Sequence, residues 1–408
     1  MATDPKKSVP PNPMLEPGQT AIDQLVASGL ADFSLRELLS VMLGNLGVAE
    51  RRAYLLRNAS DKANGFYERS LALGSLPLEV RVPRTRNGEF RPTLLPERYA
   101  RGYSDESQAL LLGLLASSRS INAAKGALRK MGLSSSEEDL DTVATALIEE
   151  LELRNTRPLD PDLLALFIDG KYIEVRDGDR LRPCCIYLAV GLSRDGKKRV
   201  LTSAIRFARE NLEDWKSVLR GLIERGLRRV LIVVQDDFSG LLPITKSLFP
   251  KADVQLCIVH MQRNAKSHLS KSDAPEFTKR LRAVKSAWSE EVAGAQFDDL
   301  CQRFQPAYPA FIGEIRKKRE HYLAFLKFPD SVRRSFSTTN VVEAVNGQLE
   351  IMRRNSGGYF QSEDALKLKL GMAVNQLETG RWRRTSVAVD AALDQLNAIF
   401  ESRLEAEA

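Results

Sequence analysis

The chain has 408 residues, of which 43% are hydrophobic and 28% are charged, a balance typical of folded globular proteins and not of disordered ones. This length is large for a single hydrophobic core, so we expect two or three domains. The formal net charge of +7 favours a polyanionic partner without establishing one. The four cysteines have no disulfide-framework spacing, and no apolar run is long enough for a membrane span or signal peptide. We therefore expect a soluble, cytoplasmic protein with no membrane partner.

The N-terminal part predicts an arm followed by a region that contacts DNA. Residues 1–18 are rich in Pro, Lys and Ser without periodicity, which predicts a disordered arm. In the region 19–102 a helical pattern comes first, and Asn64-Gly65 then indicates a turn. The extended segment that follows has six arginines, two glutamates and no lysine: Arg81, Arg84, Arg86, Arg91, Arg98 and Arg101. It fits either a DNA-gripping arm, in which Arg81, Arg84, Arg86 and Arg91 would make the contacts, or a solvated linker.

Residues 103–157 predict three helices, with the second over 121–131 and the third over 135–153. Two short helices around a Ser-Ser-Arg-Ser turn are similar to a helix-turn-helix, which by itself is a weak indication of DNA binding. We interpret this region as helix-turn-helix-like, with a role in DNA binding or dimerisation. Pro158 and Pro161 mark its boundary to the next domain.

From Asp162 onward, strands alternate with helices in the order of an RNase H-like core. We expect this catalytic core in two parts, 158–265 and 336–384, with an all-helical insertion domain at 266–335 between them. A C-terminal amphipathic helix is expected over 385–408. The predicted fold class is therefore α/β: a mixed five-stranded sheet with helices, interrupted by the insertion and preceded by a mainly helical N-terminal DNA-binding region.

Two apolar runs of this core end on an acid. The first runs into Asp169, which Gly170 follows at once, and the second, from Arg229, runs into Asp236. A carboxylate in a strand that is buried on both faces needs a compensating charge, and a metal ion is the commonest one. Two such strand ends predict one divalent-metal site.

A third acid, Glu343, lies in the first turn of a helix opened by Ser337-Thr-Thr, and Asn346 follows on the same face. Each acid also has a simpler explanation, because carboxylates are favoured at helix N-termini and Asp236 can be a turn residue. Taken together, the three acids provide hard oxygen ligands for two Mg²⁺ or Mn²⁺ ions, which suits in-line phosphoryl transfer.

Cys257 and His260 have a spacing that suggests zinc. A structural zinc site needs four ligands, and the other histidines, His268 and His321, form no second pair. We therefore expect no zinc and interpret Cys257 and His260 as residues that line the cleft beside the acids.

Two arginine clusters remain, Arg353-Arg354 and Arg381-Trp382-Arg383-Arg384. The second places an aromatic ring among cations, a combination able to stack on a base while the arginines hold phosphates. The alternative is that these residues cap helix ends. We favour DNA contact by Arg353, Arg354 and the group from Arg381 to Arg384.

These motifs, in this order, resemble the bacterial insertion-sequence transposases of the Mutator-like DDE superfamily. The matching pieces are Asn64-Gly-Phe-Tyr-Glu-Arg69, Val82-Pro-Arg-Thr-Arg-Asn-Gly-Glu-Phe90, Arg157-Pro-Leu before the Asp169 strand, Glu210 with Trp215, Arg225-Gly-Leu227, Gln235-Asp-Asp-Phe-Ser-Gly-Leu241, Gln255-Leu-Cys-Ile-Val-His260 with Arg263-Asn264, and Thr338-Thr-Asn-Val-Val-Glu343 with Asn346.

The resemblance implies that Asp169, Asp236 and Glu343 are the catalytic triad and the ligands of two Mg²⁺ or Mn²⁺ ions. It also implies that Cys257 and His260 shape the cleft, and it leaves open whether they handle a displaced base. Such transposases usually have Gly or Ala after the second Asp, whereas Asp237 stands here, so Asp237 is a candidate substitute or accessory ligand.

The function we expect is that of a DNA transposase. It would bind terminal inverted repeats and target DNA, cleave at the element ends and transfer the strands, as a homodimer because two ends must be joined in one complex. Two other classes remain open: an RNase H-fold structure-specific nuclease, and a domesticated DNA-binding regulator that does not need the acids.

Overall fold

The computed structural model describes four stretches of the chain: 35–73, 76–93, 105–130 and 137–405. The expected disordered arm at 1–18 and two of the N-terminal arginines, Arg98 and Arg101, lie outside these residues. The chain divides into two compact units, Met1–Gly113 with Lys125–Leu140, and Leu114–Ala124 with Asp141–Ala408.

The first unit contains a long helix packed on a hairpin. Helix α2 (Leu35–Arg57) contacts the antiparallel strands β1 (Ala63–Leu73) and β2 (Leu76–Thr85). Alternate residues of the hairpin, Leu78, Val80 and Val82, are buried beneath this helix, as the period of two in a strand requires.

The turn predicted at Asn64-Gly65 is wrong, because both residues lie inside β1. The register of the hairpin shifts between Ala63 and Phe66, and Gly65 has a φ of 67°. The Asn-Gly pair therefore forms a bulge, where glycine tolerates the left-handed backbone that a bulge needs. Arg51 secures this bulge by donating to the Gly65 carbonyl at 3.0 Å.

The three helices predicted after the first domain are present. They are α3 (Asp105–Ser117), α4 (Ile121–Lys130) and α5 (Glu137–Arg154).

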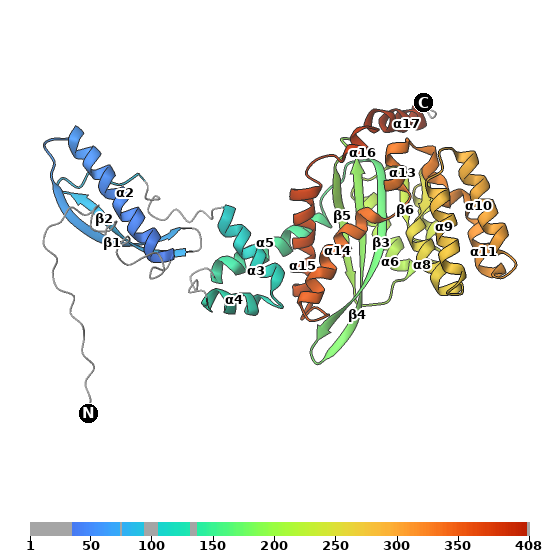
Figure 1. Cartoon of the computed structure of the whole chain (residues 1–408), viewed down its shortest axis with the longest axis horizontal. Helices are drawn as coiled ribbons and strands as arrows, with labels where there is room; N and C mark the ends of the chain where they lie inside the picture. The colour runs from blue at the N-terminus through green and yellow to red at the C-terminus, as the bar shows by residue number, and fades with distance from the viewer. Residues whose placement is uncertain (1–34, 74–75, 94–104, 131–136, 406–408) are drawn as a thin grey trace. The chain divides into compact units, whose positions relative to one another are not determined.

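The second unit is built on a mixed five-stranded sheet with the strand order β5-β4-β3-β6-β7, which confirms the α/β class and the mixed sheet (Figure 1). Three strands form an antiparallel meander: β3 (Asp162–Asp177), β4 (Arg180–Ser193) and β5 (Lys198–Arg206). Strands β6 (Arg229–Gln235) and β7 (Asp253–Leu256) run parallel to β3. Strand β7 is short, because a helix begins at Ile258.

Helices cover both faces of this sheet, which explains why β3 and β6 read as continuous apolar runs. Helices α6 (Leu212–Glu224) and α7 (Leu241–Leu248) pack on the face that includes Ile168. On the opposite face, Phe167 contacts Phe336, and α14 (Asn340–Asn355) and α15 (Glu363–Gln376) pack against β3. Because side chains alternate along a strand, Asp169 points to the same face as Phe167.

A helical block lies between β7 and α14 in the chain. Its elements are α8 (Ile258–His268), α9 (Asp273–Lys285), α10 (Glu290–Phe304), α11 (Pro309–Lys317), α12 (Arg319–Tyr322), a 3₁₀ turn (Ala324–Lys327) and α13 (Asp330–Phe336). The block has a core of its own, in which the rings of Phe277 and Phe304 meet at 5.4 Å. The boundary expected between 265 and 266 falls inside α8, so the block is continuous with the helix that follows β7.

The C-terminal part continues α15 through a π-helical turn (Leu377–Arg381) into α16 (Val387–Asp390) and α17 (Leu393–Glu405). The four cysteines are buried and free, in agreement with the expected lack of disulfides. Among the described residues, no helix combines the length and apolar character that crossing a membrane requires.

Two glycine substitutions test how α5 packs on α15. A Cβ at Gly371 would lie 2.8 Å from the Leu147 carbonyl oxygen, whereas a Cβ at Gly221 in α6 would meet no atom within 4 Å. We expect Gly371→Ala to lower the free energy of unfolding by about 1–3 kcal/mol through overpacking. Gly221→Ala should raise it by up to about 1 kcal/mol through helix propensity. Urea unfolding of both variants measures the difference, and equal effects would contradict the packing of these two helices.

Candidate active site

The register of two parallel strands brings the first two acids together. Phe167 of β3 is paired with Val234 of β6, so two residues further along each strand Asp169 and Asp236 are neighbours. Adjacent strands lie about 4.8 Å apart, which places both carboxylates at one position on the sheet. Glu343 enters from the first turn of α14, on the same face.

Asp169 is the most enclosed of these acids. It is only 6% exposed, and Asn346 Nδ2 donates a hydrogen bond to its Oδ2 at 3.1 Å. Burial raises the pKa of Asp169 to about 7, and the nearby charges of Asp236 and Glu343 add to the effect. Burial also raises the pKa of Asp236. These carboxylates are therefore costly to ionise unless a cation stands beside them.

His260 provides the first such cation. Its Nε2 lies 3.9 Å from Asp169 Oδ1, and its Nδ1 lies 3.8 Å from Asp236 Oδ1. Burial alone would lower the pKa of His260, but the interaction with the Cys257 sulfur and the charge of Asp236 outweigh it. The result is a pKa raised to about 9. The raised pKa favours the protonated form of His260 between the two strand acids.

Cys257 connects this histidine to the helix that carries Glu343. It is the N-cap residue of α8, and its sulfur accepts from the backbone N–H of Thr339 at 3.4 Å and from the Thr339 hydroxyl at 3.5 Å. Although burial raises the pKa of the Cys257 thiol, His260 and Thr339 outweigh burial and lower it. The Cys257–His260 pair therefore lies beside the acids, with the Cys257 side chain buried.

Arg263 provides a second cation, one turn after His260 on α8. Its Nη2 donates to Glu343 Oε1 at 2.6 Å, and its Nη1 lies 3.2 Å from His260 Nε2. The negative charges of all three acids thus lie beside two side chains of one helix, His260 and Arg263 of α8. In the sequence, Arg263 is one residue of the Arg263-Asn264 motif. Its contact with Glu343 follows from the α8 register, which places residues three apart on one face.

This arrangement bears on whether the residues fit a metal. In the described part of the chain, no group of three or more His, Cys, Asp or Glu side chains is close enough together to hold an ion. The donor set nevertheless suits a hard cation, because it combines three carboxylates with Asn346 Oδ1, a buried oxygen without a hydrogen-bond partner. The chemistry of the donors fits a divalent metal, with His260 and Arg263 beside the acids in this structure.

Asp237, the candidate substitute or accessory ligand, has partners outside the group of three acids in this structure. Lys318 Nζ donates to its two oxygens at 2.7 and 2.9 Å, and the Tyr322 hydroxyl donates to Oδ2 at 3.0 Å. Both carboxylate oxygens are therefore engaged by residues at the end of α11 and in α12. Asp237 anchors the helical block to the end of β6.

Glu210 is a fourth carboxylate near the site that was not predicted as a site residue. Its Oε1 accepts from Trp215 Nε1 at 2.7 Å, and burial raises its pKa. A Cβ on Gly170 would lie 2.7 Å from Glu210 Oε1, so a larger residue beside Asp169 would have to displace the Glu210 carboxylate. In the sequence, Gly170 directly after Asp169 is consistent with a close approach of another group to this strand. It does not indicate that the group is the Glu210 carboxylate.

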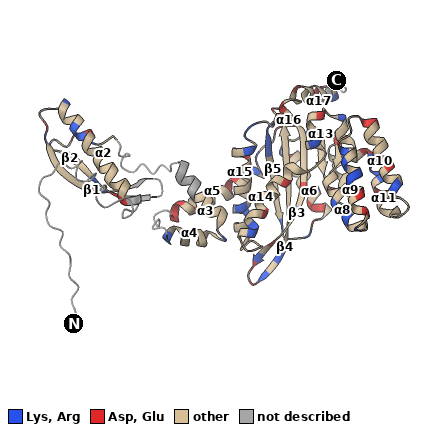
Figure 2. Cartoon of the chain, viewed as in Figure 1, with Lys and Arg blue, Asp and Glu red and all other residues tan. Residues whose placement is uncertain are grey.

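The predicted DNA-contacting arginines are dispersed. Arg81 and Arg84 of β2 lie over the rings of Phe66 and Tyr67. Lysines and arginines recur on α8, α9, α14 and the β3–β4 hairpin (Figure 2). Arg86, Arg91, Arg381, Arg383 and Arg384 are exposed.

Two of the predicted DNA-contacting arginines form ion pairs within their own helix, and the role predicted for Trp382 is wrong. Arg353 and Arg354 both pair with Glu350. The base-stacking role considered for Trp382 is contradicted, because this ring is 5% exposed and packs in the interior.

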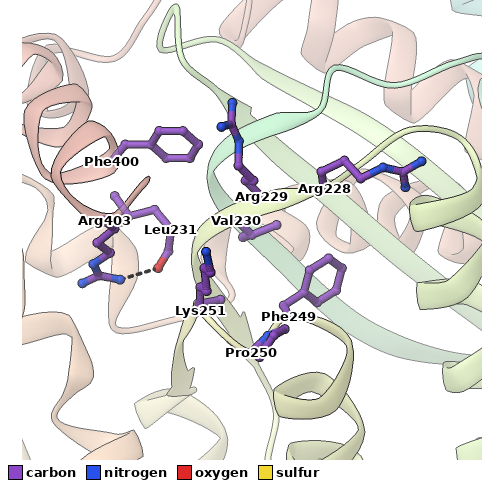
Figure 3. Close-up of a pocket in the computed structure, with 10 residues that line it drawn as sticks. Arg228, Arg229, Val230, Leu231, Phe249, Pro250, Lys251, Phe400 and Arg403 are labelled. Atoms are coloured by element: carbon purple, nitrogen blue, oxygen red, sulfur yellow. Dashed lines mark hydrogen bonds between the residues drawn. The ribbon is translucent and has the colours of Figure 1, made fainter. Parts of the chain in front are cut away.

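A separate pocket of about 280 Å³ lies at the opposite end of β6 from Asp236 (Figure 3). Arg228, Arg229, Lys251 and Arg403 surround it, above a floor that includes Phe249 and Phe400. Asp162 already binds Arg229 through two bonds of 2.6 Å, and Asp253 pairs with Arg403 at 2.6 Å. The pocket marks where α17 docks on the sheet, and it is distinct from the acid cleft.

Comparison with known proteins identifies the family. The sequence model of the transposase family described as "Transposase, Mutator family" matches residues 20–384, nearly the whole chain. The chain belongs to the Mutator family of transposases. All three acids of the cleft lie within the matched range.

Similar proteins agree with this assignment. The transposase of insertion sequence element ISRM3 from Rhizobium meliloti is 28% identical over 84% of this chain and 85% of its own length. A probable insertion-sequence transposase from Corynebacterium diphtheriae is 31% identical over 70% and 83%, respectively. The Drosophila P element transposase strand transfer complex matches 74% of this Mutator-family chain and 86% of its own, with 14% identity. Its TM-score of 0.27 is too low to bear on the fold.

The raised pKa of His260 in this transposase predicts a pH-dependent stability. A histidine whose pKa is raised from 6.5 to about 9 on folding stabilises the folded state fully below pH 6.5. This stabilisation is lost as the pH rises through about 9. In the presence of a chelator, the free energy of unfolding of wild type should be higher than that of His260→Gln by on the order of 2 kcal/mol at pH 6. At pH 10 the two free energies should differ little. Urea unfolding across this range measures the effect.

His321→Gln is the matched control. Burial lowers the pKa of His321, so its contribution should be present above pH 6.5 and decline as the pH falls below it. The proposed protonation of His260 would be contradicted if the free energies of unfolding of wild type and His260→Gln differed by the same amount from pH 6 to pH 10.

Proposed function

We propose that the chain is a DNA transposase that cleaves DNA at the ends of its element and transfers the strands, using Asp169, Asp236 and Glu343 as catalytic acids. The observation that carries the proposal is the convergence of these acids on one face of the sheet, with Asn346 fixing Asp169. The strand order supports an RNase H-like core, in which antiparallel β3–β5 continue into parallel β6 and β7.

The cofactor is proposed to be a pair of Mg²⁺ or Mn²⁺ ions and not zinc. Asp169, Asp236 and Glu343 would hold them, with Asn346 Oδ1 as a further oxygen donor. When bound, such ions supply Lewis-acid activation of a water or 3′-hydroxyl and stabilisation of the leaving oxygen in an in-line displacement. Cysteine and histidine ligands in the number a structural zinc site needs are not present around Cys257.

The protein side chains have their own part in the reaction. Asn346 Nδ2 orients the Asp169 carboxylate, and the T-shaped contact of Trp215 with Tyr187 fixes the indole that binds Glu210. His260 and Arg263 carry positive charge beside the acids, which favours the approach of a scissile phosphate. Asp237 keeps the helical block in place through Lys318.

The DNA partner is proposed to be duplex carrying the terminal inverted repeats, together with target DNA. Contacts are assigned to the arginines of β2 and the following segment, Arg81, Arg84, Arg86 and Arg91, and to the C-terminal arginines Arg353, Arg354, Arg381, Arg383 and Arg384. A homodimer in the cytoplasm is the proposed active form, because cleavage and joining involve two element ends.

Strand nicking tests this function. With Mg²⁺ or Mn²⁺, wild type should nick labelled DNA at the element ends, and chelator should abolish the activity. Glu343→Gln should reduce the nicking rate by at least about 100-fold, since it removes one of the three carboxylates proposed to hold the metal ions, while DNA affinity stays the same.

Asp237→Asn is the matched control, because it neutralises the adjacent acid on the same loop. It should keep nicking within about tenfold of wild type and lower stability by about 1–2 kcal/mol, through the weakened contact to Lys318. Nicking without preference for the ends would indicate a structure-specific nuclease. Tight DNA binding without cleavage in any metal would indicate a regulator.

A further inference from the structure

The tryptophans of this chain differ sharply in exposure. The sequence contains three, of which Trp215 is 1% exposed and Trp382 is 5% exposed, whereas Trp288 is 78% exposed. A large aromatic side chain left in water forgoes substantial hydrophobic stabilisation. An exposed indole at one fixed point of a surface is typical of a binding residue and not of a core residue.

The backbone around Trp288 is held on both sides, so its exposure is not the fraying of a loose loop. Before it, Ser286 N–H donates to the Arg282 and Ala283 carbonyls as α9 ends. After it, the Ser289 hydroxyl accepts from Val292 N–H and caps α10. Arg333 of α13 also donates to the Trp288 carbonyl at 3.4 Å. The connection between α9 and α10 therefore presents the indole from a fixed backbone, which lowers the entropy lost on binding.

Two cations without acidic partners accompany the indole. Lys285 is half-buried in the last turn of α9 and lies beside Arg334 of α13. Neither side chain has a hydrogen bond or an ion pair within the described residues. Burial and the neighbouring Arg334 charge lower the pKa of Lys285, and the Cys257 sulfur opposes this shift only in part. The acids closest in sequence, Glu290 and Glu291, open α10, where a helix N-terminus favours them, and Glu291 bonds to Ser289.

This surface adjoins the acid cleft. The electrostatic neighbours of Lys285 include Cys257, whose sulfur accepts from Thr339, the N-cap of the helix that bears Glu343. Arg334 lies nine residues before Glu343 in the chain. Lysine and arginine side chains also recur on the neighbouring helices α8 and α9 (Figure 2).

We propose that Trp288, Lys285 and Arg334 form a contact surface for an unpaired DNA strand, in which the indole stacks on a base and the two cations hold adjacent phosphates. The indole provides a flat π-face that any base can use, and each base in a duplex already has its faces covered by neighbours. The inference rests on DNA as the partner proposed above, and it gives the helical block a role in holding single-stranded DNA next to the catalytic acids.

The test uses the full chain and two probes that need no knowledge of the element, a dT₁₂ single strand and a blunt duplex of twelve base pairs. Trp288→Ala should weaken dT₁₂ binding by about 5- to 100-fold, whereas Trp288→Phe, which keeps an aromatic face, should stay within about threefold of wild type. Lys285→Ala should reduce the slope of log affinity against log salt by about 0.7, the value for one phosphate contact on a single strand.

Fluorescence gives an independent readout, because Trp288 is the exposed indole. Saturating dT₁₂ should quench the emission of wild type, and Trp288→Phe should remove this quenching, since Trp215 and Trp382 are buried. The controls are Val387→Ala, which trims another highly exposed apolar residue, and Arg220→Ala, which removes one positive charge from α6 on the other face of the sheet. Both should bind dT₁₂ as wild type does.

Several results would overturn the proposal. These are the absence of dT₁₂ binding by wild type, unchanged affinity in Trp288→Ala, or an equal loss of affinity for the blunt duplex. A change of oligomeric state in Trp288→Ala with unaltered dT₁₂ binding would assign the indole to a protein contact instead. End-specific nicking is measured separately, so loss of this proposal leaves the transposase function standing, and the reverse also holds.

Discussion

The structure of the catalytic unit depends on one electrostatic constraint, a carboxylate inside a strand that is buried on both faces. Asp169 is needed at that position by the proposed chemistry, yet burial opposes its ionisation and raises its pKa to about 7. The surrounding residues stabilise the buried carboxylate. Asn346 binds one carboxylate oxygen, and His260 lies within 4 Å of the other.

The need to compensate buried carboxylates also explains the position of α8 next to the acids. This helix begins where β7 ends and carries both His260 and Arg263 toward the acids, so that one helix compensates residues from β3, β6 and α14. Cys257 at the start of α8 ties it to Thr339 at the start of α14. The helix that carries the cations and the helix that carries the last acid are therefore joined at their N-termini. Divalent ions held by these acids would lie next to side chains that are already positively charged.

Much of this arrangement could be predicted from the sequence, and the failures have identifiable physical causes. The apolar runs before Asp169 and Asp236 marked the strands that carry the acids, because hydrophobic periodicity is a local signal. The Asn64-Gly65 bulge was misread as a turn, since both features require the same backbone conformation at glycine. The burial of Trp382 was missed because the cations flanking it point outward while its ring packs inward, a distinction that the order of residues does not contain. The ion pair of Asp237 with Lys318 joins residues 81 positions apart, so nothing local in the sequence indicated it.

The spacing of the acids also determines when the site can exist during synthesis. Asp169, Asp236 and Glu343 are separated by 67 and 107 residues, and the whole helical block from α8 to α13 is made before α14 emerges. Domains generally fold as units as the chain leaves the ribosome, so the sheet and its first two acids can form while the third is still missing. A chain that ends before Glu343 lacks one of the three proposed catalytic acids and the part of α14 and the whole of α15 that pack against β3.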